Sequence, residues 1–169
     1  MANHVRSGDS KNTEAAAAAR YFPLLFGPGF TRGDDCLENA ALNYGYAILR
    51  GCIARNLVMH GLEPCIGLHH HSELNQFNLA DDLLEPYRPL VDLFVASRSW
   101  TPHQTEELTP AIKRSLFNLT NYLVAQSQKK LRVMTSVNQA TASLAASIAA
   151  GSHALQLPAL LPLEEGTYE

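Results

Sequence analysis

Apolar residues recur at helical spacing along most of the chain, and the longest such pattern runs from about Asp35 to His60. Its apolar positions are Leu37, Ala41, Tyr44, Ile48, Cys52, Leu57 and Val58. Gly61 follows directly, as expected of a residue that ends a helix in the left-handed conformation. An earlier helix is predicted to begin near Asn12 and to include EAAAAARYFPLLF, with Pro23 tightening its last turn. We therefore expect a long central helix with another helix before it.

Helical spacing continues in the second half of the chain, where prolines stand at several boundaries. The segment NLADDLLEPYRPLVDLFVAS predicts a third helix, capped by Asn78 and kinked near Glu85, because two prolines interrupt it. Thr109 and Pro110 suit the N-cap and first residue of a fourth helix, TPAIKRSLFNLTNYLVAQ. A last helix is predicted from about residue 136 to residue 150.

The remaining segments do not favour a sheet. KKLRVMTS predicts a short extended link, and LQLPALLPLEEGTYE predicts a proline-rich tail that wraps the surface or meets a partner. We find no alternation of polar and apolar residues long enough for a sheet. The predicted fold class is all-α, with a single multi-helix domain over residues 1–169 that has roughly five to six helices around the long central one.

The composition limits the classes of function. With 169 residues, 46% of them hydrophobic, the chain can bury one sizeable core. Its net charge of −3 gives no general basic field, so DNA binding would need local basic patches or a bridging cation. Cys36, Cys52 and Cys65 lack CxxC spacing and are typical of reduced core cysteines. The N-terminus has no apolar signal region and the chain no membrane-length apolar run, so a cytoplasmic protein is predicted.

Residues suited to chemistry gather in GLHHHSELNQFNLADDLLEPYRPLVD, residues 67–92. Asp82 and Glu85 are three residues apart on a predicted helix, so both carboxylates leave the same face. A histidine from the run 69–71 could add an imidazole, and such a donor set suits Mg²⁺ or Mn²⁺ and phosphate-ester chemistry. Two plainer explanations stay open. Acidic residues near a helix N-terminus stabilise its dipole, and adjacent histidines in a polar loop are commonly solvated.

Further candidates lie elsewhere in the chain. Glu14 offers a third carboxylate from the first turn of its own helix, where a glutamate also stabilises the helix dipole. Arg20 and Arg32 lie near Glu14 in the sequence and could contact phosphates, although a solvated surface also explains them. Arg88 could hold a phosphate, but its spacing to Asp92, four residues on, favours an ion pair.

Three segments carry a resemblance to a known family: SGDSKNTEAAAAARYFPLLFG, ALNYGYAILRGCIARNLVMHGLEPCIGLHHH and NQFNLADDLLEPYRPLVD. In order and spacing they resemble the C-terminal helical domain of the CRISPR-associated spacer-integration endonucleases, in the version that accompanies type II systems. The resemblance covers nearly the whole chain. It implies a divalent-metal-dependent DNA endonuclease and integrase of antiviral defence, which cleaves phosphodiesters and joins a DNA 3′-hydroxyl to the CRISPR repeat.

The resemblance also implies the residues of the site and its cofactor. By register, the family's catalytic metal ligands fall on Glu14, His70 and Glu85, and the metal is Mg²⁺ or Mn²⁺. Asp82 and His69 are implied as supporting residues, while chemistry alone leaves both His69 and His71 open as the ligand. Basic residues around the site would position the DNA, and the candidates are Arg20, Arg32 and Arg88.

The expected partners follow from the same resemblance. They are the foreign DNA fragment, the CRISPR repeat and a small ferredoxin-like subunit, with a homodimer as a further expectation and no membrane. Family members carry a β-rich domain before the helical one, and this chain begins just before the first matching segment. A fragment, a truncated reading frame and a short family variant all fit the sequence, so the activity of the short form stays open.

Two other functions stay open as well. The first is a non-catalytic form that only binds DNA or a partner. The second is an unrelated metalloenzyme, in which two histidines of the run and one carboxylate bind iron.

Overall fold

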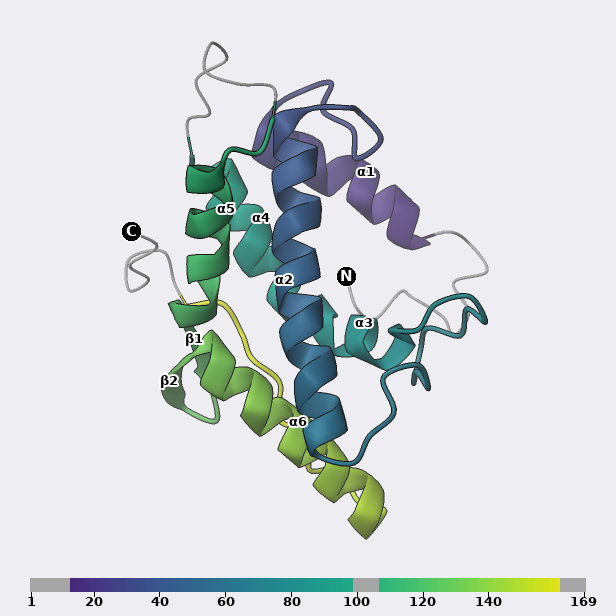
Figure 1. Ribbon diagram of the computed structural model, residues 1–169. Helices are drawn as coiled ribbons and strands as arrows, with labels where there is room; N and C mark the ends of the chain where they lie inside the picture. The colour runs from purple at the N-terminus through teal and green to yellow at the C-terminus, as the bar shows by residue number, and fades with distance from the viewer. Residues whose placement is uncertain (1–12, 99–106, 162–169) are drawn as a thin grey trace.

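The computed structural model describes residues 13–98 and 107–161, and for Thr13 and Glu14 it describes the backbone alone. Within these ranges the chain forms six α-helices, two short 3₁₀ helices and one hairpin (Figure 1). The α-helices are α1 (Thr13–Phe26), α2 (Leu37–Met59), α3 (Asn78–Leu84), α4 (Arg88–Ala96), α5 (Pro110–Phe117) and α6 (Val133–Ala150). The prediction of a mainly helical fold is confirmed.

Helix α2 crosses the middle of the molecule, as predicted, and contacts α3, α4, α5 and α6 (Figure 1). Its buried positions include Ala41, Leu42, Leu49, Ile53 and Leu57. Gly61 follows the helix with a φ of 75°, and its N–H donates to the carbonyl oxygen of Val58 at 3.0 Å. A residue that adopts positive φ without strain therefore ends this helix, as the sequence indicates.

Gly45 lets α2 and α4 approach closely. A Cβ atom on Gly45 would lie 2.5 Å from Cγ1 of Val91, whose side chain is fully buried. We expect Gly45→Ala to lower the free energy of unfolding by about 1–3 kcal/mol, because the core has to shift to admit the methyl group. Gly51→Ala is the matched control on the same helix, since nothing lies within 4 Å of its added Cβ. It should raise stability by up to about 1 kcal/mol. Urea denaturation measures both, and equal stabilities would contradict the tight contact.

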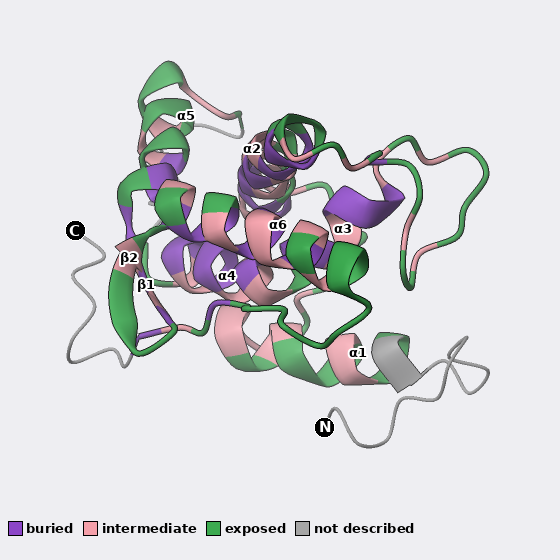
Figure 2. Cartoon of the chain, turned by 90° about the horizontal axis from the view of Figure 1, so that it is seen from below, coloured by how far each residue is buried: buried purple, intermediate pink, exposed green. Residues whose placement is uncertain are grey.

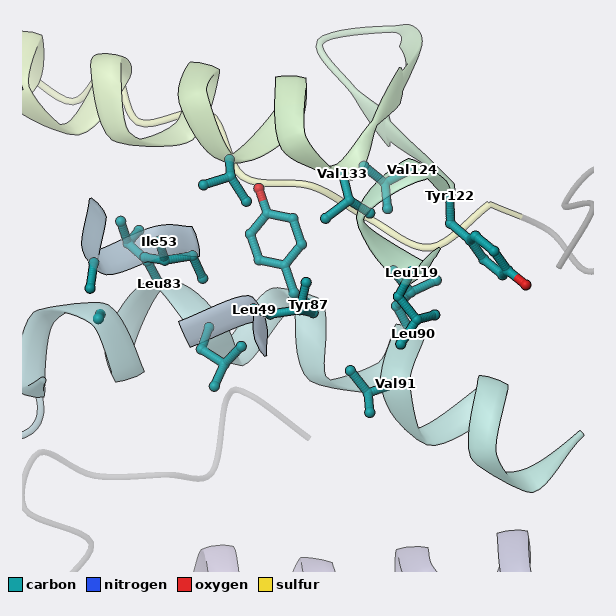
Figure 3. Close-up of a cluster of buried hydrophobic side chains, with 14 of the residues drawn as sticks. Leu49, Ile53, Leu83, Tyr87, Leu90, Val91, Leu119, Tyr122, Val124 and Val133 are labelled. Atoms are coloured by element: carbon teal, nitrogen blue, oxygen red, sulfur yellow. The ribbon is translucent and has the colours of Figure 1, made fainter. Parts of the chain in front are cut away.

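The core is one cluster built on helices α2 to α6, the two 3₁₀ helices and the hairpin. Figure 2 shows the buried positions on the inward sides of these helices and the exposed positions on their outer sides. Tyr87 stands in the middle of the cluster, among Leu49, Leu90 and Val133 (Figure 3). Its hydroxyl oxygen lies 2.8 Å from Oγ of Ser136, so the buried polar atom is satisfied.

The predicted interruption of the third helix is present. The first 3₁₀ helix, η2 (Glu85–Tyr87), separates α3 from α4 at the proline-rich segment. Asn78, however, is not an N-cap. It is the first residue of α3, and its side-chain amide donates to the carbonyl oxygens of Cys65 at 3.0 Å and Ser72 at 2.8 Å. The amide therefore ties the preceding loop to α3 instead of capping the helix.

The region after α5 differs from the prediction. Thr109 does cap α5, and its hydroxyl accepts from the N–H of Ile112 at 3.3 Å, but the helix ends at Phe117. The second 3₁₀ helix, η3 (Asn118–Asn121), then leads to strands β1 (Leu123–Gln126) and β2 (Lys129–Arg132). Ser127 and Gln128, with φ values of 51° and 62°, make the two-residue turn of this antiparallel hairpin. Strands of four residues are too short for their alternation to be recognised in the sequence, so the prediction of no sheet is wrong here. Helix α6 accordingly starts at residue 133, earlier than predicted.

The segment after α6 packs on its own domain. Ala159 pairs with Ala125 of β1 through two backbone hydrogen bonds of 2.8 and 2.9 Å, and Leu161 is 5% exposed. The sequence predicted that this tail either wraps the surface or meets a partner. The part up to residue 161 wraps the surface.

Cys65 is exposed, so the prediction of core cysteines is wrong for that residue, while Cys36 and Cys52 are partly buried. The helices of the described ranges include none with the length and apolar character needed to cross a membrane.

Candidate functional site

Asp82 holds the histidine-bearing loop against α3. This loop, residues 61–77, joins α2 to α3. The carboxylate of Asp82 accepts backbone hydrogen bonds from the N–H groups of Leu68 at 2.5 Å, His69 at 3.0 Å and His70 at 3.1 Å. Its side chain is only 8% exposed. Three N–H groups that converge on one buried carboxylate fix the loop backbone at the histidine run.

The same carboxylate orients the ring of His70. Nδ1 of His70 lies 2.7 Å from Oδ1 of Asp82. Burial raises the pKa of Asp82, but the hydrogen bonds from His69, His70 and Leu68 outweigh it and bring the pKa below its usual value. Because the ionised carboxylate can only accept, Nδ1 carries a proton and donates, and in the neutral ring the lone pair is then on Nε2. Histidines that ligate metals are commonly held in this way by a carboxylate.

The two neighbouring histidines are placed differently. The ring of His69 packs edge-on against that of His70, with centroids 5.5 Å apart. His69 and His71 are exposed, whereas the side chain of His70 is 36% exposed and directed to Asp82. Of the three candidates in the run, His70 is therefore the one whose ring Asp82 fixes.

Gly67 makes the close wrapping of this loop possible. A Cβ atom at Gly67 would lie 2.2 Å from the carbonyl oxygen of His70 and 2.9 Å from Cβ of Asn78. Both are atoms that cannot move without moving the backbone. Gly67 was not among the residues predicted for the site, although a glycine two residues before a histidine run indicates a tight loop.

Glu85 lies one helical turn beyond Asp82, at the start of η2. Its Oε1 is 3.0 Å from Nε of Arg88, and the two side chains are 51% and 39% exposed. The N–H at Nε does not point at this oxygen well enough to count as a hydrogen bond. The contact is therefore an ion pair with poor alignment, between the predicted ligand Glu85 and a predicted DNA-contacting residue.

The predicted ion pair between Arg88 and Asp92 is wrong. Asp92 is 3% exposed, and its carboxylate accepts hydrogen bonds from the hydroxyl groups of Tyr21, at 3.0 Å, and Tyr46. Burial raises the pKa of Asp92, while the two tyrosines, and then Arg88 and Arg32, oppose this effect. Helical spacing allows both Glu85 and Asp92 as the partner of Arg88. Arg88 pairs with Glu85 because Asp92 is buried against the two tyrosines.

This tyrosine pair also anchors α1. Tyr21 lies on α1 and Tyr46 on α2, so Asp92 of α4 joins all three helices. Glu14 belongs to the first turn of α1, but its side chain lies outside the described residues. In Figures 1 and 2 the N-terminal half of α1 lies on the same side of the molecule as the histidine loop. The position of the Glu14 carboxylate stays a prediction.

The described side chains do not by themselves complete a metal site. Across residues 15–98 and 107–161, no group of three or more His, Cys, Asp and Glu side chains is placed to hold a metal ion. The residues nonetheless fit the donor set for Mg²⁺ or Mn²⁺. His70 presents a free Nε2 fixed by Asp82, and the Glu85 carboxylate follows one turn later. With His70 and Glu85 as two ligands, the candidate for a third is Glu14, whose side chain lies outside the described ones.

The predicted basic residues have distinct surroundings. Arg20 is exposed on α1. Arg32 lies in the loop between α1 and α2, where its guanidinium donates to the side-chain oxygens of Asn39 and Asn43. Arg88 is paired with Glu85. Arg50 of α2, which was not among the residues predicted from the sequence, lines the same pocket as Arg32 and Arg88.

Comparison with known proteins gives the family. Residues 32–108 match the family model described as CRISPR associated protein Cas1. Over its full length the chain is 45% identical to the CRISPR-associated endonuclease Cas1 of Neisseria meningitidis serogroup C (strain 8013), and it covers 56% of that protein. The chain belongs to the Cas1 family. His70, Asp82 and Glu85 all lie inside the region that matches the Cas1 model, and Glu14 lies before it.

Other Cas1 proteins match shorter stretches. CRISPR-associated endonuclease Cas1 1 of Pyrobaculum aerophilum is 46% identical over 88 residues, which is 48% of this chain and 28% of that protein. A solved structure titled "Casposase bound to integration product" superposes with a TM-score of 0.67 at 23% identity, over 88% of this chain and 50% of the other. The casposase therefore shares the fold. The chain spans about half the length of the first Cas1 relative it matches.

Proposed function

We propose that this chain is the metal-dependent nuclease and integrase region of a Cas1 protein that acts on DNA in CRISPR spacer acquisition. The observation that carries the proposal is the imidazole of His70, held by the ionised Asp82 one helical turn from Glu85, inside the region that matches the Cas1 model. The Cas1 relatives are named endonucleases, and the casposase structure contains an integration product. Both names fit phosphodiester chemistry on DNA.

In this proposal His70, Glu85 and Glu14 hold one Mg²⁺ or Mn²⁺ ion. Once bound, the ion supplies Lewis acidity, which polarises a phosphodiester and lowers the pKa of the attacking hydroxyl or water. The chain's own residues have separate tasks. Asp82 keeps a proton of His70 on Nδ1, so that in the neutral ring Nε2 is the nitrogen available as a ligand. The poorly aligned ion pair leaves Glu85 able to change partner.

The partners proposed for the site are a foreign DNA fragment and the CRISPR repeat. Arg20, Arg32 and Arg88 are proposed to contact DNA phosphates, which gives positioning with little sequence readout. Contact with a small ferredoxin-like subunit and formation of a homodimer are proposed for the whole protein, because the chain covers 56% of its Cas1 relative.

The test is cleavage of branched and single-stranded DNA by the purified protein in Mn²⁺, in Mg²⁺ and in EDTA. We expect activity with either cation, none in EDTA, and a loss of roughly 100-fold or more in Glu85→Gln and in Glu14→Gln. Glu63→Gln removes an equal charge from an exposed position in the same loop region and should keep wild-type activity. Cleavage that is equal in EDTA and Mn²⁺, or equal in all four proteins, would overturn the metal mechanism.

Two other functions give different results in the same experiment. DNA binding without turnover under any cation would favour a binding form of the family. Tightly bound iron in the purified protein would favour an unrelated metalloenzyme built on the histidine run.

A further inference from the structure

Three arginines line a pocket next to the histidine loop. The pocket has a volume of about 310 Å³, and its lining includes Arg32, Arg50, Arg88, Asn43, Tyr46 and Asp81. The arginines come from three places: the loop between α1 and α2, the middle of α2, and the start of α4. Asp81 lines the pocket while the adjacent Asp82 holds the histidine loop, so α3 joins the two features.

The pocket is more positive than the rest of the chain. Three guanidinium groups line it together with one carboxylate, that of Asp81, although the whole chain has a net charge of −3. Such a local concentration of positive charge attracts an anion to this place on an otherwise acidic protein. Guanidinium groups match the geometry of phosphate oxygens, because their N–H groups form a planar fork.

Aromatic rings hold the three arginines in place. The guanidinium carbons of Arg88 and Arg32 lie 5.1 and 5.7 Å from the centroid of the Tyr46 ring. That of Arg50 lies 5.0 Å from the centroid of the Phe77 ring. Stacking of this kind already restricts each arginine side chain, so the arginine loses less conformational entropy when it binds a ligand.

The arginines differ in how far their N–H donors are used. Arg32 is committed to two asparagine side chains. The Arg50 guanidinium approaches Asp81 only to 3.9 Å, which is beyond hydrogen-bond distance. The buried Nε of Arg88 has no hydrogen-bond partner within the described part of the chain, despite its ion pair with Glu85. Arg32 therefore uses two of its five N–H donors, whereas Arg50 and Arg88 make no hydrogen bond within the described part of the chain.

We infer that this pocket binds a backbone phosphate of a DNA strand through Arg50 and Arg88, and that Arg88 exchanges Glu85 for that phosphate. The inference rests on the proposed function, in which Glu85 also serves as a metal ligand. When Glu85 turns to a cation, its negative charge leaves Arg88, whose N–H groups then face the phosphate. Cation binding and DNA binding favour each other for this reason, and the coupling is reciprocal.

The exchange is testable without any metal. A fluorescein-labelled ten-nucleotide DNA strand is titrated with the protein in EDTA, and its anisotropy is followed. We expect Arg50→Gln to weaken binding about fivefold or more, because a charged hydrogen-bonding partner of the phosphate is lost. Arg55→Gln removes the same charge from an exposed position on α2 outside the pocket lining, and it should change affinity less than about twofold. Equal affinities of these two variants, or no saturable binding by the wild type, would overturn the pocket assignment.

A double-mutant cycle tests the role of Glu85. Without cation, Glu85→Gln should tighten DNA binding about threefold or more, because Arg88 is released from its ion pair. The gain should disappear in the Arg88→Gln background, and Glu63→Gln measures the general effect of removing one negative charge. If the two substitutions had additive effects on the free energy of DNA binding, the exchange would be overturned. Strands with and without a 5′-phosphate should bind alike, since a preference for the phosphorylated strand that depends on Arg50 would contradict a backbone-phosphate site.

These binding measurements are independent of catalysis. A coupled cycle in a protein that never cleaves DNA would leave the pocket in place and remove the proposed enzymatic function. Additive effects in a protein that shows metal-dependent cleavage would leave the proposed enzymatic function in place and remove the exchange.

Discussion

Replacing His70 with alanine is expected to lower Mn²⁺-dependent DNA cleavage by roughly 100-fold or more, because the imidazole is proposed as a metal ligand and not only as a support. The variant should fold, since the His70 side chain is 36% exposed and lies on a surface loop. It should also bind Mn²⁺ more weakly. The measurements are initial cleavage rates over a range of Mn²⁺ concentrations, and Mn²⁺ affinity by calorimetry.

His71→Ala is the matched control for this prediction. The residue is exposed and directly follows His70, so the variant removes the same chemical group from the same loop. It should retain activity within about threefold, as expected for a surface substitution away from the site. If His71→Ala or His69→Ala lost activity while His70→Ala retained it, the assignment of the ligand from the Asp82 contact would be wrong.

Replacing Gly67 with alanine is expected to lower cleavage by about 10- to 100-fold, although Gly67 has no side chain to contribute to the reaction. The added methyl group would lie 2.2 Å from the carbonyl oxygen of His70, so the backbone has to move. That movement pulls the N–H groups of Leu68, His69 and His70 away from Asp82. Cleavage rates measure the loss, and amide hydrogen exchange of residues 67–71 shows whether the loop has opened.

The loss should be local. Only the two ends of the loop, at Leu62 and Phe77, pack against the hydrophobic cluster. The unfolding midpoint of Gly67→Ala should therefore fall far less than that of Gly45→Ala, whose added methyl group enters the core. Gly51→Ala again serves as the control, because its added methyl group meets open space. Wild-type cleavage by Gly67→Ala, or an equal fall in the midpoints of the Gly67 and Gly45 variants, would contradict this account of the loop.

Part of the site could be predicted from the sequence. The positions of His70, Asp82 and Glu85 follow from a histidine run, an i, i+3 acidic pair and the resemblance to a family. The structure adds that Asp82 bonds to both the backbone and the ring of His70. That contact spans twelve residues, and it depends on how the loop folds back over α3, which no local spacing encodes.

The partner of Arg88 illustrates the limit of helical spacing. Glu85 precedes Arg88 by three residues and Asp92 follows it by four, so an isolated helix would allow either ion pair. In the folded chain Asp92 is buried against Tyr21 and Tyr46, which come from two other helices. Competition between hydroxyl donors and a guanidinium for one buried carboxylate is settled only when these helices pack.

The sequence by itself determined the mainly helical class, the long central helix with its glycine stop, the proline break between α3 and α4, and the cap of α5. Each of these depends on neighbours within about one or two helical turns, where backbone sterics and periodicity decide. Only the tertiary structure decided the hairpin, the wrapping of the histidine loop around Asp82, and the pocket of Arg32, Arg50 and Arg88. Those features join segments that are distant in sequence, and their energies come from burial and from hydrogen bonds that exist once the helices have packed.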